Sequence, residues 1–249
     1  MVLCYNTGMM FEKIKKYIKA LKNSKRYENI VPLGYNCEIA YRFYRKFGFF
    51  DSSLFGWSYV TFEQLKNALS NFDFIGKGDL EYDKASHMFK CKNTGIFFHG
   101  RTPADAFTDN EEENLEIIKK DEEELRSRVE YLKEKFVKYA TNGKNTLYIL
   151  KIKSNNDVLR KEIIWLYEFM KDFCKNDFCI LLITEKSFYS EFLFDNPKIL
   201  TRYVEKYSPD ECVTSKKQGD AFGWKLIFTE FKPKKYKKQK GKLKFEVSE

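Results

Sequence analysis

Apolar residues in the second half of the chain alternate between nearly continuous runs and helical stripes. Residues 146–153 and 178–184 are mostly apolar, which is typical of strands that are buried on both faces. The segment between them, residues 157–173, has apolar side chains at helical spacing, namely Leu159, Ile163, Leu166 and Met170. A strand, a helix and a strand in this order favour a parallel pair of strands with a right-handed crossover.

The same alternation extends toward both ends of the chain. Beyond residue 184 we expect a helix, a strand and a helix, near residues 188–194, 199–207 and 222–231. Near the other end, the apolar segment 29–33 precedes a helix that Gly48 ends. The inward stripe of that helix consists of Ile39, Ala40, Phe43 and Phe47.

Residues 49–140 interrupt this alternation. An aromatic loop runs to Tyr59, and a short helix is expected over residues 62–69. Residues 87–91 and 95–99 read as a hairpin, and a long charged helix follows from a cap at Thr108, Asp109 or Asn110 to about Ala140. We therefore expect an α/β fold with a mostly parallel sheet and flanking helices in a Rossmann-like layering, plus a small β-hairpin insertion.

The charge of the chain is concentrated at its two ends. The 249 residues carry a net charge of +9, but residues 1–26 hold seven basic residues and one acidic residue, and residues 232–249 hold eight lysines and two glutamates. The segment between them therefore has a net charge of −3. A nucleic-acid groove would instead concentrate lysine and arginine on the fold, so we expect no nucleic-acid partner.

Three parts follow from this layout: a basic amphipathic helix over residues 1–27, a single α/β domain over residues 28–231, and a disordered, lysine-rich tail over residues 232–249. The apolar stripe of the first part comprises Phe11, Ile14, Ile18 and Leu21. The stripe either packs on the domain, which is slightly favoured, or lies on an anionic membrane surface.

The chain has neither a run of about 18 apolar residues nor a secretory signal, so no transmembrane segment is expected. We expect a cytoplasmic protein, with peripheral attachment to the inner membrane face left open.

Cys37 stands out among the polar residues because it begins the helix that follows segment 29–33. A cysteine at a helix N-terminus is favoured as the thiolate, which is the nucleophilic form. In the preceding loop, Gly34 allows close backbone approach, and Tyr35 and Asn36 are placed to bind substrate. Ligands of parallel α/β sheets bind at such loops, where strands end. Cys37 is therefore a candidate nucleophile, although burial in the core is an equally ordinary role for a free cysteine.

A thiolate nucleophile needs a base, and the chain has two histidines, His87 and His99. His99 is the better candidate because it ends a predicted strand beside Gly100 and Arg101. Asp220 could orient the imidazole or simply cap the last helix. Arg101 could bind an anionic substrate group or form a surface ion pair.

The remaining binding candidates are Trp57, which could stack on a sugar, and Trp224. The six cysteines are scattered and form no C-x-x-C pair, so we expect reduced thiols, no metal site and no bound cofactor.

Several short motifs resemble a bacterial family described as papain-like cysteine peptidases, whose members often accompany enzymes of surface-polysaccharide synthesis. The resemblance covers residues 28–231 and rests on five motifs: Leu33-Gly34-Tyr35-Asn36-Cys37, Ser53-Leu54-Phe55-Gly56-Trp57, Ile96-Phe97-Phe98-His99, Leu147 to Lys153, and Asp220 to Trp224. It implies a Cys37/His99 dyad and a papain-like α+β fold, which is the alternative to the α/β fold. The family pattern has aspartates where this chain has Gly56 and Gly100.

Three functions remain open from the sequence. The first is a thiol-dependent hydrolase or acyltransferase with the Cys37/His99 dyad. The second is a glycosyltransferase or related transferase of surface-glycan assembly, in which the loop of residues 34–37 holds a sugar nucleotide as donor. The third is a non-catalytic glycan-binding module. A small-molecule or glycan substrate is expected in each case.

Overall fold

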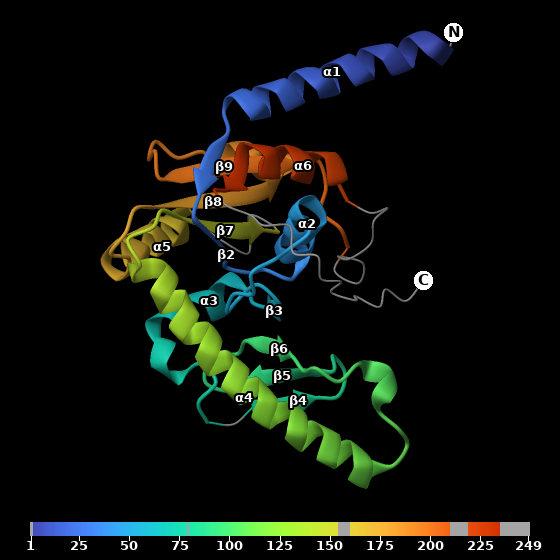
Figure 1. The fold of residues 1–249 in the computed structure, drawn as a ribbon, viewed down its shortest axis with the longest axis vertical. Helices are drawn as coiled ribbons and strands as arrows, with labels where there is room; N and C mark the ends of the chain where they lie inside the picture. The colour runs from blue at the N-terminus through green and yellow to red at the C-terminus, as the bar shows by residue number, and fades with distance from the viewer. Residues whose placement is uncertain (1, 79, 154–159, 210–218, 235–249) are drawn as a thin grey trace.

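A four-stranded parallel sheet forms the centre of the protein in a computed structural model that describes residues 2–78, 80–153, 160–209 and 219–234 (Figure 1). Its strand order is β2-β7-β8-β9. The strands are β2 (Asn29–Pro32), β7 (Thr146–Ile152), β8 (Phe178–Glu185) and β9 (Ile199–Val204). The α/β class and the parallel pairing of β7 with β8 are confirmed.

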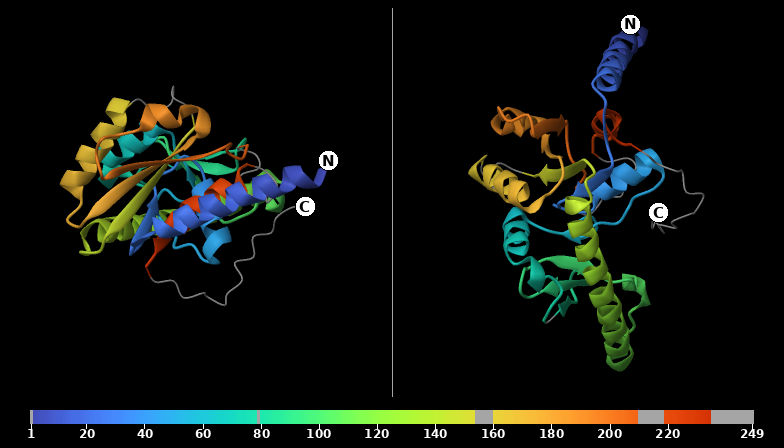
Figure 2. Two further views of the ribbon diagram at one scale, coloured as in Figure 1. Left: turned by 90° about the horizontal axis from the view of Figure 1, so that it is seen from above. Right: turned by 60° about the vertical axis from the view of Figure 1, so that its left-hand side comes forward.

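Helices cover both faces of this sheet because its central strands are apolar on both sides. On one face, Leu147, Ile149, Leu181 and Ile183 share a core with α2 (Glu38–Phe47) and α6 (Ala221–Glu230). On the other face, Tyr148, Leu150, Ile180 and Leu182 pack with α4 (Glu111–Thr141) and α5 (Arg160–Phe173). Figure 2 shows this arrangement from two further directions.

A second, antiparallel sheet lies beside the first and has the order β3-β6-β5-β4. Its strands are β3 (Ser58–Tyr59), β4 (Leu80–Asp83), β5 (Met88–Cys91) and β6 (Phe97–His99). The predicted hairpin is confirmed as β5 and β6, with Phe89 opposite Phe98. Two short strands that the sequence pattern did not indicate complete the sheet.

Helices α3 (Phe62–Ser70) and α4 join the two sheets into one core. In α4, the side chain of Val129 meets the turn at Gly76, while the Phe136 ring lies 6.0 Å from the ring of Tyr148 in β7. Figure 1 shows α4 running from the antiparallel sheet to the parallel sheet. Asn110 caps α4, as expected, by accepting hydrogen bonds from the N–H groups of Glu112 and Glu113.

The segment that follows α1 (Val2–Lys22) meets the segment that follows α6. Strand β1 (Lys25–Tyr27) pairs in parallel with β10 (Phe231–Pro233). The expected disordered tail over residues 232–249 is therefore wrong at its start, because residues 232 and 233 belong to β10; residues 235–249 lie outside the described residues. Residues 157–159 of the helix expected over 157–173 also lie outside them.

Two further expectations are corrected. The helix near residues 188–194 is a 3-10 helix, η3 (Lys186–Phe192). The apolar stripe of α1 (Val2–Lys22) does not pack on the domain, because Phe11, Ile14 and Ile18 are 65%, 46% and 46% exposed. Two other short 3-10 helices are η1 (Phe72–Phe74) and η2 (Ala104–Ala106). Over the described ranges, no helix is both long and apolar enough to cross a membrane.

Candidate functional site

The loop after β2 turns sharply at the carboxyl end of the parallel sheet. The N–H of Leu33 still donates to the carbonyl of Ile149 at 2.8 Å, which continues the pairing with β7. Gly34 then has φ +115°, and a Cβ there would lie 3.1 Å from the carbonyl oxygen of Val60. The N–H of Val60 donates to the carbonyl of Tyr35 at 2.9 Å. Glycine is needed at position 34 because the backbone conformation and the close approach both exclude a side chain.

Cys37 occupies the N-cap position of α2, as the sequence predicted. Its carbonyl accepts the first intrahelical hydrogen bond, from the N–H of Tyr41 at 2.9 Å. The helix ends at Gly48, which has φ 76° and donates its N–H to the carbonyl of Tyr44. The thiol of Cys37 is half-buried, whereas the other described cysteine side chains are buried: Cys91, Cys174 and Cys179. Cys37 is thus the described thiol best placed to meet a ligand.

Directly after Cys37, the carboxylate of Glu38 is fully buried and accepts hydrogen bonds from several directions. Its Oε2 atom lies 2.9 Å from Lys151 Nζ, in an ion pair whose side chains are 0% and 1% exposed. Its Oε1 atom accepts from Trp224 Nε1 at 3.2 Å and from the N–H of Ser208 at 3.3 Å. These contacts join α2, β7, α6 and the segment after β9 at one point.

Arg42, one helical turn after Glu38, is the second cation of this cluster. Its Nη2 atom lies 3.4 Å from Glu38 Oε1 and donates to Ser208 Oγ at 2.6 Å. Arg42 and Lys151 are 6% and 1% exposed in their side chains, so two buried cations meet one buried carboxylate. We call Glu38, Arg42 and Lys151 the buried ion cluster.

Lys151 connects the buried ion cluster to the loop. Its Nζ atom also donates to Asn36 Oδ1 at 3.3 Å, and Asn36 Oδ1 accepts the N–H of Glu38 at 3.2 Å. The ammonium lies 4.3 Å from the centre of the Tyr207 ring, a cation–π distance. Burial and the nearby Glu38 raise the pKa of Tyr207 well above its usual value, so its hydroxyl stays neutral and donates to the carbonyl of Ile152 at 3.0 Å.

Two tyrosines flank the loop. Tyr35 and Tyr59 are half-buried, their hydroxyl oxygens lie 2.8 Å apart, and their rings meet edge to face with centroids 5.1 Å apart. Lys153 Nζ lies 5.3 Å from the centre of the Tyr35 ring. The loop therefore combines a thiol, aromatic surface and nearby cationic side chains.

His99 lies on the other side of β3 from this loop. Tyr35 forms a bridge with Val60, which follows β3, and β3 pairs with β6 through Ser58 opposite Phe98. The side chain of His99 is open to solvent at the end of β6, but the protein around the imidazole desolvates it in part. This desolvation first, and the nearby Arg128 guanidinium second, lower the pKa of His99. His99 is thus neutral near pH 7 and able to accept a proton. The Cys37/His99 dyad remains a prediction.

The structure gives Asp220 and Arg101 local partners. Asp220 caps α6, because its Oδ1 atom accepts the N–H of Gly223 at 2.8 Å and its Oδ2 atom accepts the N–H of Glu205 at 2.9 Å. Neither contact involves His99, so Asp220 acts as the helix cap that was its alternative role. Arg101 is 69% exposed and pairs with Glu124 at 3.0 Å, which is the surface ion pair considered as its alternative role.

The two tryptophans differ in exposure. Trp57 is half-buried, and its ring meets Phe50 edge to face at 5.7 Å, so part of its surface is open to a ligand. Trp224 is 1% exposed and donates its indole N–H to Glu38. The expected substrate contact at Trp224 is corrected: the residue supports the buried ion cluster from the core.

The glycines that replace expected aspartates stand at crowded positions. At Gly56 a Cβ would lie 2.7 Å from Ser53 Oγ and 3.0 Å from Phe50 Cζ. At Gly100 a Cβ would lie 2.5 Å from Asp121 Oδ2. Asp121 is buried and accepts the N–H of Thr102 at 3.0 Å. Neither glycine position accommodates an aspartate in this packing.

The sequence interpretation missed the buried ion cluster. Lys151 offered the one usable signal, since a lysine within an apolar strand that is buried on both faces requires a buried partner. Glu38 and Arg42 have the i, i+4 spacing that is ordinary for ion pairs on exposed helix surfaces, so their spacing gives no sign of burial. No group of three or more histidine, cysteine, aspartate or glutamate residues within the described ranges is arranged to hold a metal ion.

Comparison of the chain with protein-family models gives no match, and comparisons with curated proteins and with solved structures give none either.

Proposed function

We propose that this protein is an enzyme that uses Cys37 as a thiolate nucleophile toward an acyl substrate, as a hydrolase or acyltransferase. The observation that carries the proposal is the position of a half-buried thiol at the N-cap of α2, in front of a buried ion cluster with one carboxylate and two cations. The two buried cations and the helix N-terminus both favour an anion at this loop. That anion is first the thiolate and then the oxyanion of the intermediate.

The proposed reaction begins when the Cys37 thiolate attacks the acyl carbonyl carbon. A C–S bond forms and the carbonyl π electrons move to oxygen, giving an oxyanion. Because Asn36 Oδ1 accepts from Lys151 and from the Glu38 N–H, the Nδ2 group is the donor end of that side chain. We assign Asn36 Nδ2 and the N–H groups that follow that of Glu38 in the first turn of α2 to the oxyanion.

His99 is the proposed acid and base. It takes the thiol proton and returns it to the leaving group when the oxyanion collapses and the bond to that group breaks. Its lowered pKa supports this assignment, because a neutral imidazole accepts a proton near pH 7. Attack of water, or of another acceptor, on the thioester then releases the acyl group and regenerates the thiol. The motif resemblance favours acyl substrates linked to bacterial surface-polysaccharide metabolism.

The test is the pH dependence of alkylation by iodoacetamide, read for each cysteine by peptide mass spectrometry. We expect Cys37 to react faster than the buried Cys91, with an apparent pKa below the usual value of about 8.5. The Lys151→Met variant should raise that apparent pKa, because it removes a buried cation behind the loop. The His99→Ala variant should raise it only if the two side chains interact.

Slow alkylation of Cys37 with an ordinary pKa would overturn the nucleophile proposal. Activated esters and thioesters provide a second readout: wild-type protein should form a covalent acyl adduct at Cys37 that Cys37→Ser does not form. Absence of an adduct over a broad acyl panel would count against acyl transfer even if the thiol is reactive.

The alternative is a transferase that uses a sugar nucleotide. The observation that favours it is a pair of buried cations at the carboxyl end of a parallel sheet, where phosphate groups commonly bind. In this case Cys37→Ser retains binding of a nucleoside diphosphate, whereas Lys151→Met weakens it, as isothermal titration would show. A glycan-binding module, with Trp57 as a stacking platform, would bind oligosaccharide and show neither thiol reactivity nor nucleotide binding.

A further inference from the structure

Helix α1 has an apolar face that nothing in the described structure covers. Its apolar residues fall within one arc of about 100° on a helix of 3.6 residues per turn, and Lys15 borders this arc, with its Nζ atom 5.9 Å from the centre of the Phe11 ring. They are 60%, 65%, 46%, 46% and 44% exposed in chain order: Met10, Phe11, Ile14, Ile18 and Leu21. Exposure of a whole stripe is unusual for a soluble helix and indicates an interaction surface.

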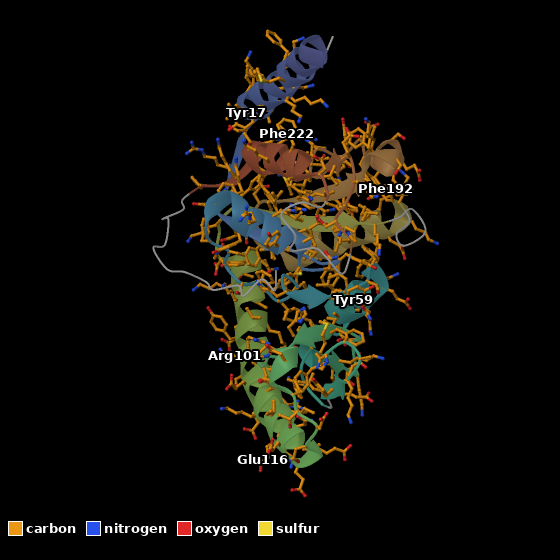
Figure 3. All side chains as sticks on the ribbon, turned by 90° about the vertical axis from the view of Figure 1, so that its right-hand side faces the viewer. Tyr17, Tyr59, Arg101, Glu116, Phe192 and Phe222 are labelled. Carbon is orange, nitrogen blue, oxygen red and sulfur yellow. The ribbon has the colours of Figure 1, made fainter. Side chains whose placement is uncertain are left out.

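A different face of α1 holds the helix on the domain. Ala20 is 7% exposed, and Lys13 Nζ lies 5.6 Å from the ring centre of Phe222 at the start of α6. Tyr17 is half-buried, with Lys225 Nζ of α6 at 5.3 Å from its ring centre. Figure 3 shows Tyr17 on the side of α1 that faces the domain, near Phe222. The contact with α6 therefore leaves the apolar arc facing outward.

The tertiary structure also gathers positive charge around the base of α1. Along the helix itself, every lysine from residue 13 to residue 22 is exposed: Lys13, Lys15, Lys16, Lys19 and Lys22. Pairing of β1 with β10 places Arg26 opposite Lys232, so these two basic residues, which are far apart in the sequence, lie side by side. The pKa of Lys46 is lowered by burial and by the nearby Lys225 and Lys232, as expected where cations crowd together.

We propose that α1 lies on an anionic lipid surface, with the apolar arc inserted at the level of the headgroups and the surrounding lysines over lipid phosphates. An exposed apolar stripe between lysines, next to a segment of net charge −3 over residues 27–231, has the layout of an interfacial helix. Lipid supplies both the apolar layer and the negative charge that this face needs. A second copy of the chain fits less well, because two lysine-rich faces repel each other.

The experiment is co-sedimentation of the full chain with vesicles of phosphatidylcholine alone and with vesicles that also contain phosphatidylglycerol. We expect binding to the anionic vesicles at least tenfold tighter than to the neutral ones, and loss of that preference as salt is added. Ile14→Ser/Ile18→Ser should reduce binding about tenfold or more, and Lys15→Glu/Lys19→Glu should remove the preference for anionic lipid.

Matched controls come from other exposed helices. Ile164, on α5, is 50% exposed, and Ile164→Ser should leave vesicle binding unchanged. Lys119→Glu/Lys120→Glu on α4 reverses the same number of charges away from α1 and should also have no effect. Because the substituted side chains are exposed, the melting temperature should stay within a few degrees of wild type and show that each variant is folded.

Equal binding to both kinds of vesicle, no binding to either, or equal loss in the control variants would overturn the proposal. Sedimentation velocity tests the competing explanation, in which a second copy of the chain covers the apolar arc. If the wild type self-associates and Ile14→Ser/Ile18→Ser is monomeric, the arc is a self-association surface and the membrane assignment is wrong. A monomer in both cases, together with selective vesicle binding, supports it.

Discussion

The parallel and antiparallel sheets of this protein treat charged side chains in opposite ways. In β7 every side chain is buried, so Lys151 has its ammonium 2.9 Å from the buried carboxylate of Glu38. In β6 burial changes along the strand, His99 is exposed, and the next charged residue, Arg101, meets Glu124 at the surface. The N–O distance is about 3 Å in both ion pairs, yet water reaches only the pair of Arg101 with Glu124.

The difference teaches that distance alone does not rank these ion pairs. An exposed pair stabilises a protein by about 0–1 kcal/mol, because water screens it and competes for it. In a buried pair, water cannot take the place of a missing partner. Removal of one partner therefore leaves a desolvated charge, which lowers the free energy of unfolding by about 3–5 kcal/mol. The candidate site is built on the buried kind, which makes its charges rigid and strongly coupled to folding.

The largest expected effect is that of Glu38→Gln. This change removes the buried carboxylate that pairs with both Lys151 and Arg42. We expect the free energy of unfolding to fall by about 3–5 kcal/mol, measured by urea denaturation. The matched variant Glu124→Gln removes the exposed partner of Arg101 and should cost less than about 1 kcal/mol. Equal losses in the two variants would contradict the distinction between the regions.

A smaller effect is expected from Gly100→Ala in the antiparallel region. The added Cβ would lie 2.5 Å from Asp121 Oδ2 and 3.3 Å from Phe89 Cε2, so packing must shift at a cost of about 1–3 kcal/mol. In a double-mutant cycle, Asp121→Ala should remove most of this penalty, because the closest obstructing atom is gone. Strict additivity of the two changes would show that Asp121 is not the obstacle.

The smallest effect concerns the pH dependence contributed by His99. Its pKa is lower in the folded protein than the unfolded value of about 6.5, so above that pH both states carry the neutral imidazole and the residue adds no pH dependence. As pH falls below about 6.5, the unfolded chain binds a proton that the folded protein does not, and stability declines until the folded pKa is reached.

His99→Gln should therefore flatten the fall in unfolding free energy between pH 7.5 and pH 5.5, as urea denaturation at the two values would show. His87→Gln is the matched loss of a histidine in the same sheet. A profile that flattens in His87→Gln and not in His99→Gln would contradict the assignment.

The sequence predicted correctly those helices and strands whose bounds depend on residues close together in the chain. The start of α2 at Cys37 and its end at Gly48 follow from N-terminal capping and from the left-handed conformation that glycine adopts at φ 76°. The runs that became β7 and β8 read correctly because strands buried on both faces are continuously apolar. Two residues of β3 carry no comparable pattern, and that strand was missed.

The candidate site was predicted only in part for the same reason. The loop of residues 34–37 could be located because it follows a strand and begins a helix. The contact between Glu38 and Lys151 joins residues 113 positions apart, and the contact of Glu38 with Trp224 joins residues 186 positions apart. No spacing rule for helices or strands covers such separations, so these partners could not be paired from the sequence.

The sequence by itself determined the α/β class, the parallel central strands, the thiol at a helix start and the basic character of both chain ends. Only the tertiary structure decided that the stripe of α1 faces outward, that β1 pairs with β10, and that Lys151 and Arg42 share the carboxylate of Glu38. The division has one physical cause: periodicity and capping act between residues a few positions apart, whereas burial and charge pairing depend on which surfaces meet after folding.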